Sequence, residues 1–196
     1  MPLLPLVAQA SGRQPEAVLA VPQHQAAAAA LAGGQATTYA ISPERRALLN
    51  TIRFAEGTWV GGSHDGYRVL YGGGRFASLA RHPELTVKRR YTSAAAGAYQ
   101  FLPGTWREAQ QRLGLPDFGP ASQDQAALFL VDRRGVLDQF DRKGLDATVL
   151  ARLANEWASL PASHGGSAYG QPVKRADQLV RFYRADLQRQ RQEGQA

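Results

Sequence analysis

Glu56 is the residue whose type and setting are best suited to chemistry, and it lies in the stretch FAEGT at 54–58. Apolar residues recur at helical spacing up to this point, and Gly57 is a typical helix stop, so Glu56 is expected on the last turn. The negative end of the helix dipole and the apolar neighbours Phe54 and Trp59 disfavour an ionised carboxylate and raise its pKa. A carboxyl that stays protonated near neutral pH is suited to general acid catalysis. The pattern also fits a solvated glutamate beside a capping glycine.

The elements around Glu56 must position it. Ser42 is suited to cap the preceding helix and Pro43 to begin it. Beyond the helix, glycines are frequent and 67–71 (YRVLY) alternates, which predicts a small β-hairpin with Asp65-Gly66 as its turn. Such loops beside an acid suggest one wall of a cleft, although an ordinary glycine-rich surface loop has the same composition.

Apolar stripes at helical spacing predict several more helices. They are expected from Pro103 to a stop at Gly114, from a capping box at Ser122–Gln125, over Val136–Phe140, from Val149 through Trp157 to Leu160-Pro161, and over Val173–Leu187. Short helices combined with a small β-element predict an α+β fold of mainly helical content.

Composition limits the classes of function. The 196 residues carry a net charge of +7 and no cysteine, and the four histidines are scattered, so we expect no thiol chemistry, no metal and no cofactor. A basic chain favours a polyanionic partner, which leaves nucleic acid, an anionic membrane and an acidic wall polymer open. The cluster Lys88-Arg89-Arg90 fits such a partner or a solvated surface.

Three regions are expected along the chain. Residues 1–41, rich in proline, glutamine and alanine, read as a poorly ordered leader or linker, 42–190 as the catalytic domain and 191–196 as a C-terminal tail. The first ten residues lack a basic segment and hold two prolines, so they make no convincing signal peptide. No stretch approaches the length of a membrane span.

Four blocks in register resemble one known family. They are FAEGT at 54–58, DGY at 65–67 leading to Gly72-Gly73, AGAYQ at 96–100, and WASLP at 157–161 followed by YGQ at 169–171. Their order and spacing resemble the lambda-type phage endolysins, which are lysozyme-like peptidoglycan lytic transglycosylases. The resemblance covers about 44–187 and implies a lysozyme-like domain whose small β-element lines a saccharide cleft.

The resemblance also implies roles for individual residues. Glu56 matches the catalytic acid of the family, and the substrate-binding residues expected in or near the cleft are Tyr67, Tyr99, Gln100, Trp157, Ser159, Tyr169 and Gln171. Aromatic rings stack on sugar faces and amides bind acetamido and hydroxyl groups, which suits this set. Trp157 also lies on an apolar helix face and fits the core. Arg68 stands where the family has an aspartate, and the loop 162–168 is longer than its counterpart.

The expected function is therefore cleavage of the bond between N-acetylmuramic acid and N-acetylglucosamine, with a 1,6-anhydro product and Glu56 as acid and then base. A hydrolysing lysozyme, in which Asp65 or another carboxylate positions water, and a non-catalytic basic binding module are the alternatives. The expected partner is the peptidoglycan glycan strand, and no nucleic acid is expected. The protein is expected to be a monomer that acts at the bacterial cell wall or in the periplasm.

Overall fold

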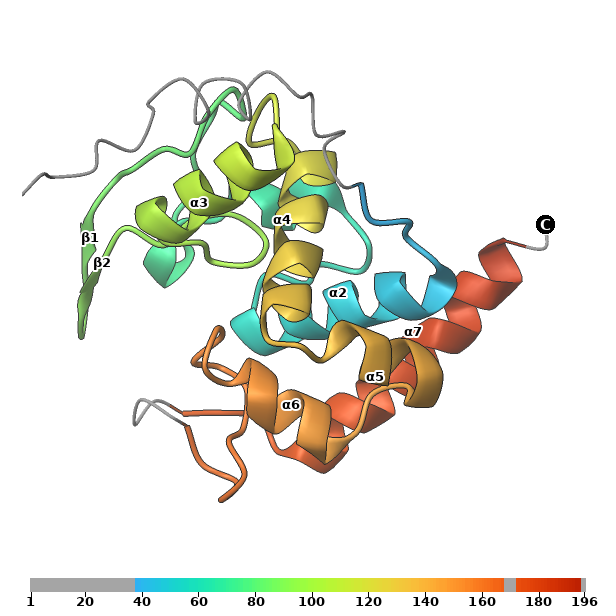
Figure 1. Cartoon of the computed structure of the whole chain (residues 1–196). Coiled ribbons are helices and arrows are strands. Elements are labelled where there is room, and N and C mark those ends of the chain that lie inside the picture. Colours follow the sequence, from blue (N-terminus) through green and yellow to red (C-terminus); the bar gives the residue numbers. More distant parts are fainter. Residues whose placement is uncertain (1–37, 168–171, 195–196) are drawn as a thin grey trace, which may run out of the picture. The chain divides into compact units, whose positions relative to one another are not determined.

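Helix α2 (Pro43–Glu56) lies at the centre of the fold in the computed structural model, which describes residues 38–167 and 172–194 (Figure 1). The side chain of Ser42 accepts a hydrogen bond from the Arg45 N–H at 3.3 Å, and Pro43 occupies the first turn. Gly57 ends the helix with φ of 75°, a left-handed conformation that costs glycine little. The predicted bounds of this helix are confirmed.

The other elements are short and mostly helical. In chain order they are the 3-10 helices η1 (His64–Arg68) and η2 (Tyr71–Gly73), the strands β1 (Val87–Lys88) and β2 (Thr92–Ser93), and the helices α3 (Pro103–Leu113), α4 (Pro120–Arg133), α5 (Leu137–Lys143), α6 (Ala147–Leu153) and α7 (Ala176–Glu193). This confirms the expected α+β fold of mainly helical content.

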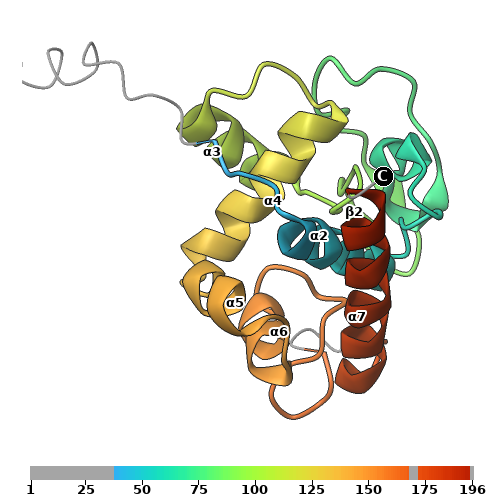
Figure 2. The same ribbon diagram turned by 90° about the vertical axis from the view of Figure 1, so that its right-hand side faces the viewer.

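The core forms around α2. Its residues Ala47, Leu48, Leu49 and Ile52 have no exposed surface, because α7 lies along one side of the helix and α4 packs against another (Figure 2). Phe54 extends the contact with α7 by stacking on Phe182, with ring centres 4.3 Å apart. Two helices distant in sequence thus hold the helix that carries Glu56.

The small β-sheet is not where the sequence predicts it. Strands β1 and β2 pair antiparallel, with Val87 opposite Ser93 and Lys88 opposite Thr92. Within 67–71, Val69 and Leu70 form only isolated antiparallel bridges, to Arg75 and Ala96, and no named strand. Asp65 and Gly66 instead belong to η1, whose first turn is capped by the Ser63 hydroxyl. A Cβ at Gly66 would collide with the carbonyl oxygen of Thr58, so this glycine permits close packing and does not form a hairpin turn.

Several predicted helix bounds are also wrong, and α7, for example, begins at Ala176 and not at Val173. Helix α4 begins at Pro120 and not at Ser122, because the Ser122 hydroxyl donates to Asp117 Oδ1 at 2.7 Å and does not cap the helix. Helix α6 ends at Leu153, four residues before Trp157. Residues 154–160 turn back on themselves instead, and this turn becomes important at the site.

Residues just before α2 are attached to the domain. The backbone N–H of Tyr39 donates to Gln125 Oε1 at 2.7 Å, the Gln125 amide donates to the Tyr39 carbonyl at 2.9 Å, and the Tyr39 hydroxyl donates to Asp132 at 3.0 Å. Ile41 packs against the core. These contacts indicate that the domain begins before Ser42. The rest of the predicted leader, 1–37, lies outside the described part of the chain, as do residues 195–196 of the predicted tail.

Candidate active site

Glu56 is the last residue of α2, at the edge of the packed core. The chain turns sharply after it, since the N–H groups of Thr58 and Trp59 both donate to the carbonyl of Arg53. The Thr58 hydroxyl donates to the Ala98 carbonyl at 2.5 Å, which ties this turn to the segment leading into α3. The backbone on both sides of the acid is therefore fixed.

The carboxyl of Glu56 lies in an environment that favours its neutral form. Burial raises its pKa from 4.5 to about 7, while the hydrogen bond from Ser159 and the positive charge of Lys174 act in the opposite direction. The Ser159 hydroxyl donates to Glu56 Oε1 at 2.6 Å. A substantial fraction of the carboxyl is therefore protonated at neutral pH, which is the state required of a general acid.

The turn after α6 supplies this serine. Trp157 Nε1 donates to the carbonyl of Tyr99 at 3.1 Å, and the side chains of Trp157 and Leu160 are buried. The N–H of Trp157 also donates to the Leu153 carbonyl at the end of α6. These contacts hold Ser159 opposite the end of α2, across 103 residues of sequence.

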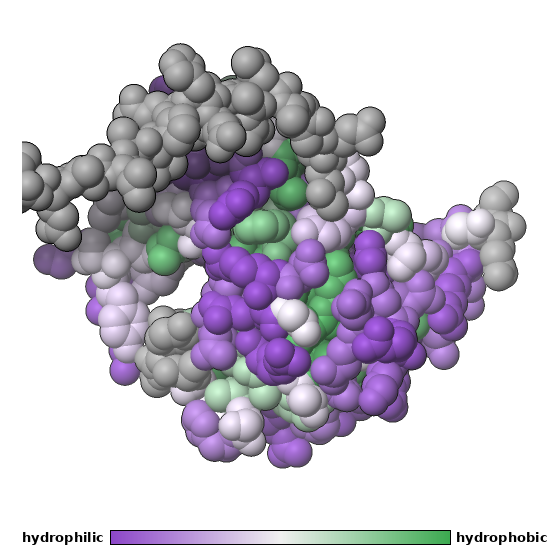
Figure 3. All heavy atoms as spheres, viewed as in Figure 1, coloured by the Kyte–Doolittle hydropathy of each residue, from purple (hydrophilic) through white to green (hydrophobic). Residues whose placement is uncertain are grey.

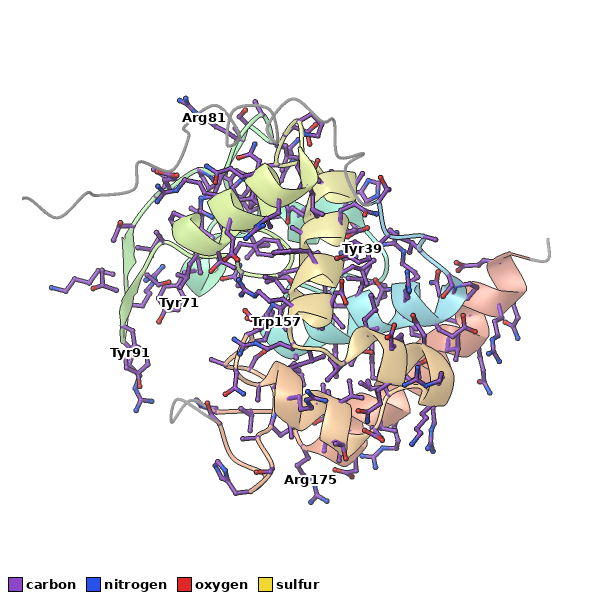
Figure 4. The ribbon with its side chains drawn as sticks, viewed as in Figure 1. Tyr39, Tyr71, Arg81, Tyr91, Trp157 and Arg175 are labelled. Atoms are coloured by element: carbon purple, nitrogen blue, oxygen red, sulfur yellow. The ribbon has the colours of Figure 1, made fainter. Side chains whose placement is uncertain are left out.

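A hollow of about 530 Å³ opens beside Glu56, between the β1–β2 hairpin and the turn after α6 (Figure 3). Its walls come from the hairpin side, from the residues before and in α3, and from the turn: Tyr71, Tyr91, Thr92, Ser93, Ala95, Gln100, Leu102, Thr105, Asn155, Glu156, Trp157, Ala158 and Ser159. Figure 4 shows Tyr71 and Tyr91 on the hairpin side and Trp157 on the side of α6. An acid beside an open groove with aromatic walls suits a sugar chain.

A second carboxylate, Glu156, lines the same hollow but is bound by two arginines. Both of its oxygens accept hydrogen bonds from Arg133, at 2.7 and 2.8 Å, and one accepts a further bond from Arg134 at 2.6 Å. Asp65 does not line the hollow; it forms an exposed ion pair with Arg75 at 2.9 Å. Glu56 is thus the one carboxyl in the described walls of the hollow without a basic side chain bound to it.

Comparison with known proteins identifies this arrangement. A family model named Endolysin matches residues 46–189, which is most of the chain. The chain belongs to the endolysin family.

Individual relatives agree with this assignment. The endolysin of Escherichia phage lambda is 37% identical over 145 residues, which cover 71% of this chain and 89% of that protein. The endolysin of Escherichia phage P2 is 34% identical over 155 residues, covering 70% and 89%. The solved structure of bacteriophage lambda lysozyme in complex with a chitohexasaccharide superposes with a TM-score of 0.67 at 34% identity, covering 76% of this chain and 96% of that one. The fold is lysozyme-like, and the chain is a peptidoglycan-degrading enzyme of the endolysin class.

Three of the residues expected at the endolysin cleft line the hollow with Glu56, namely Gln100, Trp157 and Ser159. Gln100 has φ of 48°, and its side-chain amide donates to the carbonyls of Gly97 and Val69. The contacts of these three residues with substrate stay a prediction.

The structure places Tyr67 and Tyr99 in the core, and neither lines the hollow beside Glu56. Their expected role in substrate binding stays a prediction. Both side chains are buried, and both hydroxyls donate to Asp124 Oδ1, at 2.7 and 2.5 Å. Arg46 donates to the other oxygen of Asp124 at 2.6 Å. These tyrosines satisfy a buried charge, and Tyr99 reaches the site only through its backbone carbonyl and Trp157.

The ring of Trp59 packs edge-on against Phe182 and lies near the guanidinium of Arg53, and it does not line the hollow. Tyr169 and Gln171 lie outside the described residues. Conversely, sequence reasoning missed Tyr71 and Tyr91. Tyr71 ends the alternating stretch 67–71, and Tyr91 directly follows the basic cluster at 88–90. The signal that could have pointed to Tyr91 as a binding residue is an aromatic side chain next to a charged, surface-exposed turn.

The described residues contain no cluster of three or more His, Asp and Glu side chains placed to hold a metal ion. Among the helices of the same residues, none is long and apolar enough to cross a membrane.

Proposed function

We propose that this endolysin is a lytic transglycosylase, which cleaves the β-1,4 bond between N-acetylmuramic acid and N-acetylglucosamine and leaves a 1,6-anhydro-muramic acid end. Glu56 is the catalytic residue, acting first as an acid and then as a base. Gln100, Trp157 and Ser159 bind or orient the substrate, and Tyr169 and Gln171 are proposed at the lip of the same cleft.

The acid step uses the geometry of Glu56. Because the Ser159 hydroxyl donates to Oε1, the proton of the neutral carboxyl is best carried on Oε2, which leaves that oxygen to donate to the bridging oxygen of the glycan. Proton transfer breaks the bond between C1 and the bridging oxygen, and the departing sugar takes the proton as a hydroxyl.

The second step returns the proton. The C6 hydroxyl of the muramic acid attacks its own C1 and forms the new C6–O–C1 bond, while its proton passes to the carboxylate of Glu56. No water is consumed, and Glu56 ends in the protonated state in which it began. One carboxyl and an internal hydroxyl therefore suffice for the whole reaction.

The observation that carries this proposal is that, in the described walls of the hollow, Glu56 is the one carboxyl with no arginine bound to it. A retaining hydrolase needs a second carboxylate at about 5 to 5.5 Å, and an inverting one needs a carboxylate at about 6.5 to 9.5 Å that holds a water. Glu156 is the other acid in the described walls of the hollow, and hydrogen bonds from two arginines occupy three of its roughly four lone-pair sites, which makes it a weaker base or nucleophile. The chitohexasaccharide in the related lambda lysozyme supports glycan binding in a cleft of this kind.

Glu156 also defines the alternative function. Since it lines the hollow with Glu56, release from its arginines would turn it into a base for water, and the protein would then be a hydrolysing lysozyme.

We propose the bacterial wall as the place of action and a monomer as the acting form.

The chemical nature of the products tests the proposal. Purified peptidoglycan strands digested in water labelled with heavy oxygen should yield anhydro ends that weigh one water less than hydrolysed fragments and contain no label. Label at C1, or reducing muramic acid ends, would assign the protein to the hydrolases. The Glu56→Gln variant should release neither product, because an amide has no acidic proton to give.

A further inference from the structure

Three basic side chains at the rim of the cleft form no ion pair within the described residues. Lys88, Arg89 and Arg90 follow one another at the tip of the β1–β2 hairpin, and all three are exposed. No described carboxylate forms an ion pair with any of them. By contrast, Arg45, Arg133 and Arg181 on the helices are each paired with an acid. The hairpin tip therefore carries an uncompensated positive charge.

This charge is held beside the cleft and not on a free arm. The residues that directly follow it, Tyr91, Thr92 and Ser93, line the hollow that holds Glu56. The guanidinium of Arg90 lies over the ring of Tyr91, 5.5 Å from its centre, and the hydrocarbon stem of Arg89 packs over Gly72. Gly72 has φ of 80°, and a Cβ there would lie 3.0 Å from the Arg89 stem, so only a glycine leaves this space open. Figure 4 shows Tyr91 projecting from the same tip.

We infer that Lys88, Arg89 and Arg90 bind carboxylates of the peptide stems that muramic acid carries, and so make the enzyme prefer peptide-bearing strands over naked glycan. The inference rests on the proposed function, in that it requires a glycan strand in the cleft. A strand lying beside Glu56 and Tyr91 directs its peptide substituents outward past the rim, where stem carboxylates meet the three cations. Each such contact is solvent-exposed and individually weak, so the effect comes from several charges acting together.

Purified peptidoglycan strands in three forms separate the effect of the stem carboxylate charge from the effect of the size of the stems. The first form carries the native stems, the second has been stripped of its stems by an amidase, and in the third the stem carboxylates have been converted to amides. Wild-type kcat/KM should be about three- to tenfold higher on native stems than on either other form, and the excess should fall with added salt because the charges are exposed. Equal rates on native and amidated stems would overturn the inference.

The triple variant Lys88→Gln, Arg89→Gln, Arg90→Gln locates the effect. It should lose the preference for native stems while it cleaves stripped strands within about twofold of the wild-type rate. A matched variant, Arg112→Gln, Arg142→Gln, Arg184→Gln, removes the same charge from exposed helix positions that do not line the hollow, and it should keep the preference. An equal loss in both variants would show that net charge alone is responsible.

Two further outcomes keep this inference separate from the proposed reaction. If stripped strands are cleaved but yield hydrolysed ends, the transglycosylase proposal fails and the preference for native stems is still measurable. If the preference in wild type is abolished by inorganic phosphate at low millimolar concentration, but not by chloride at the same ionic strength, the rim is a phosphate site and the assignment to stem carboxylates is wrong.

Discussion

At the scale of single residues, the buried carboxyl of Glu56 links catalysis to stability. Its pKa is about 7 in the folded protein and near 4.5 in the unfolded chain, so between these values the unfolded state releases its proton more readily. The neutral carboxyl therefore makes its full contribution to the free energy of unfolding below about pH 4.5. This contribution is lost as the pH rises to about 7. The function of the residue therefore has a cost in stability at neutral pH.

Replacing Glu56 with glutamine tests this linkage. Because an amide cannot ionise, Glu56→Gln should melt at a higher temperature than the wild-type protein at pH 8 and at nearly the same temperature at pH 4. Thermal melts recorded by circular dichroism at both pH values give the comparison. A variant that melts lower than wild type by the same amount at both values would show that the carboxyl is not held in a medium that disfavours its charge.

Ser159 provides a second prediction, on the pH dependence of the rate. The wild-type kcat should fall as pH rises through about 7, when the acid loses its proton. The hydrogen bond from Ser159 lowers the pKa of Glu56, so Ser159→Ala should move this fall to higher pH and reduce kcat up to about 100-fold through lost positioning.

The conservative variant supplies the control for this experiment. Ser159→Thr retains the hydroxyl and should keep the pH at which the wild-type rate falls. A pH profile of kcat that is identical in Ser159→Ala and wild type would mean that the serine contacts only the substrate.

At the scale of elements, the buried side chain of Asp124 connects α2, η1, α4 and the segment before α3. It accepts from Arg46, Tyr67 and Tyr99, and burial together with this carboxylate raises the pKa of Tyr67 to about 12, so the phenol stays a donor. Asp124→Asn should lower the free energy of unfolding by about 3 kcal/mol, because it removes a buried carboxylate that accepts from the half-buried Arg46 and from two buried tyrosines. Urea denaturation measures this loss.

The milder change Tyr67→Phe removes one of the donors and should cost about 1 kcal/mol. If both variants unfold at the same urea concentration as wild type, the carboxylate is not the element that joins these segments. Glycan binding should survive in Tyr67→Phe, since its ring does not line the cleft.

The sequence predicts elements whose signals are local. The caps Ser42 and Gly57 and the early proline define α2, and Pro103 with Gly114 defines α3, because each signal acts within one turn of its helix. The hairpin was misplaced because alternation at 67–71 reflects packing against the core, which only the folded chain supplies. The burial of Tyr67 and Tyr99 could not be predicted for the same reason, since their partner Asp124 lies 57 and 25 residues away.

The candidate site follows the same rule. Glu56 was found because its motif and its helix end are contiguous in sequence. The contact between Glu56 and Ser159, the aromatic side chains of Tyr71 and Tyr91 at the cleft, and the arginines on Glu156 depend on the packing of distant segments. Their residue types occur at many surface positions, and the sequence holds no spacing that singles them out.

At the scale of the whole molecule, the beginning of the domain can be tested by truncation. A chain that starts at Thr38 keeps the three hydrogen bonds between Tyr39 and α4, whereas one that starts at Ala40 loses them. The shorter version should melt several degrees lower, as expected for about 1 to 3 kcal/mol in a domain of this size.

Tyr39→Phe in the longer version is the matched control, because it removes only the bond to Asp132 and should show a smaller loss. Equal melting temperatures for the versions starting at Thr38 and Ala40 would place the boundary of the domain at Ser42, as the sequence predicts.

The pairing of Glu56 with Ser159 has a consequence for the time course of biosynthesis. A ribosome that has completed α2 has already made the acid, but the serine comes 103 residues later and α7, which lies along α2, later still. Until those segments emerge, Glu56 is an ordinary ionised glutamate in water and has no proton to donate at neutral pH. We therefore expect fragments that end before Ser159 or before α7 to lack lytic activity.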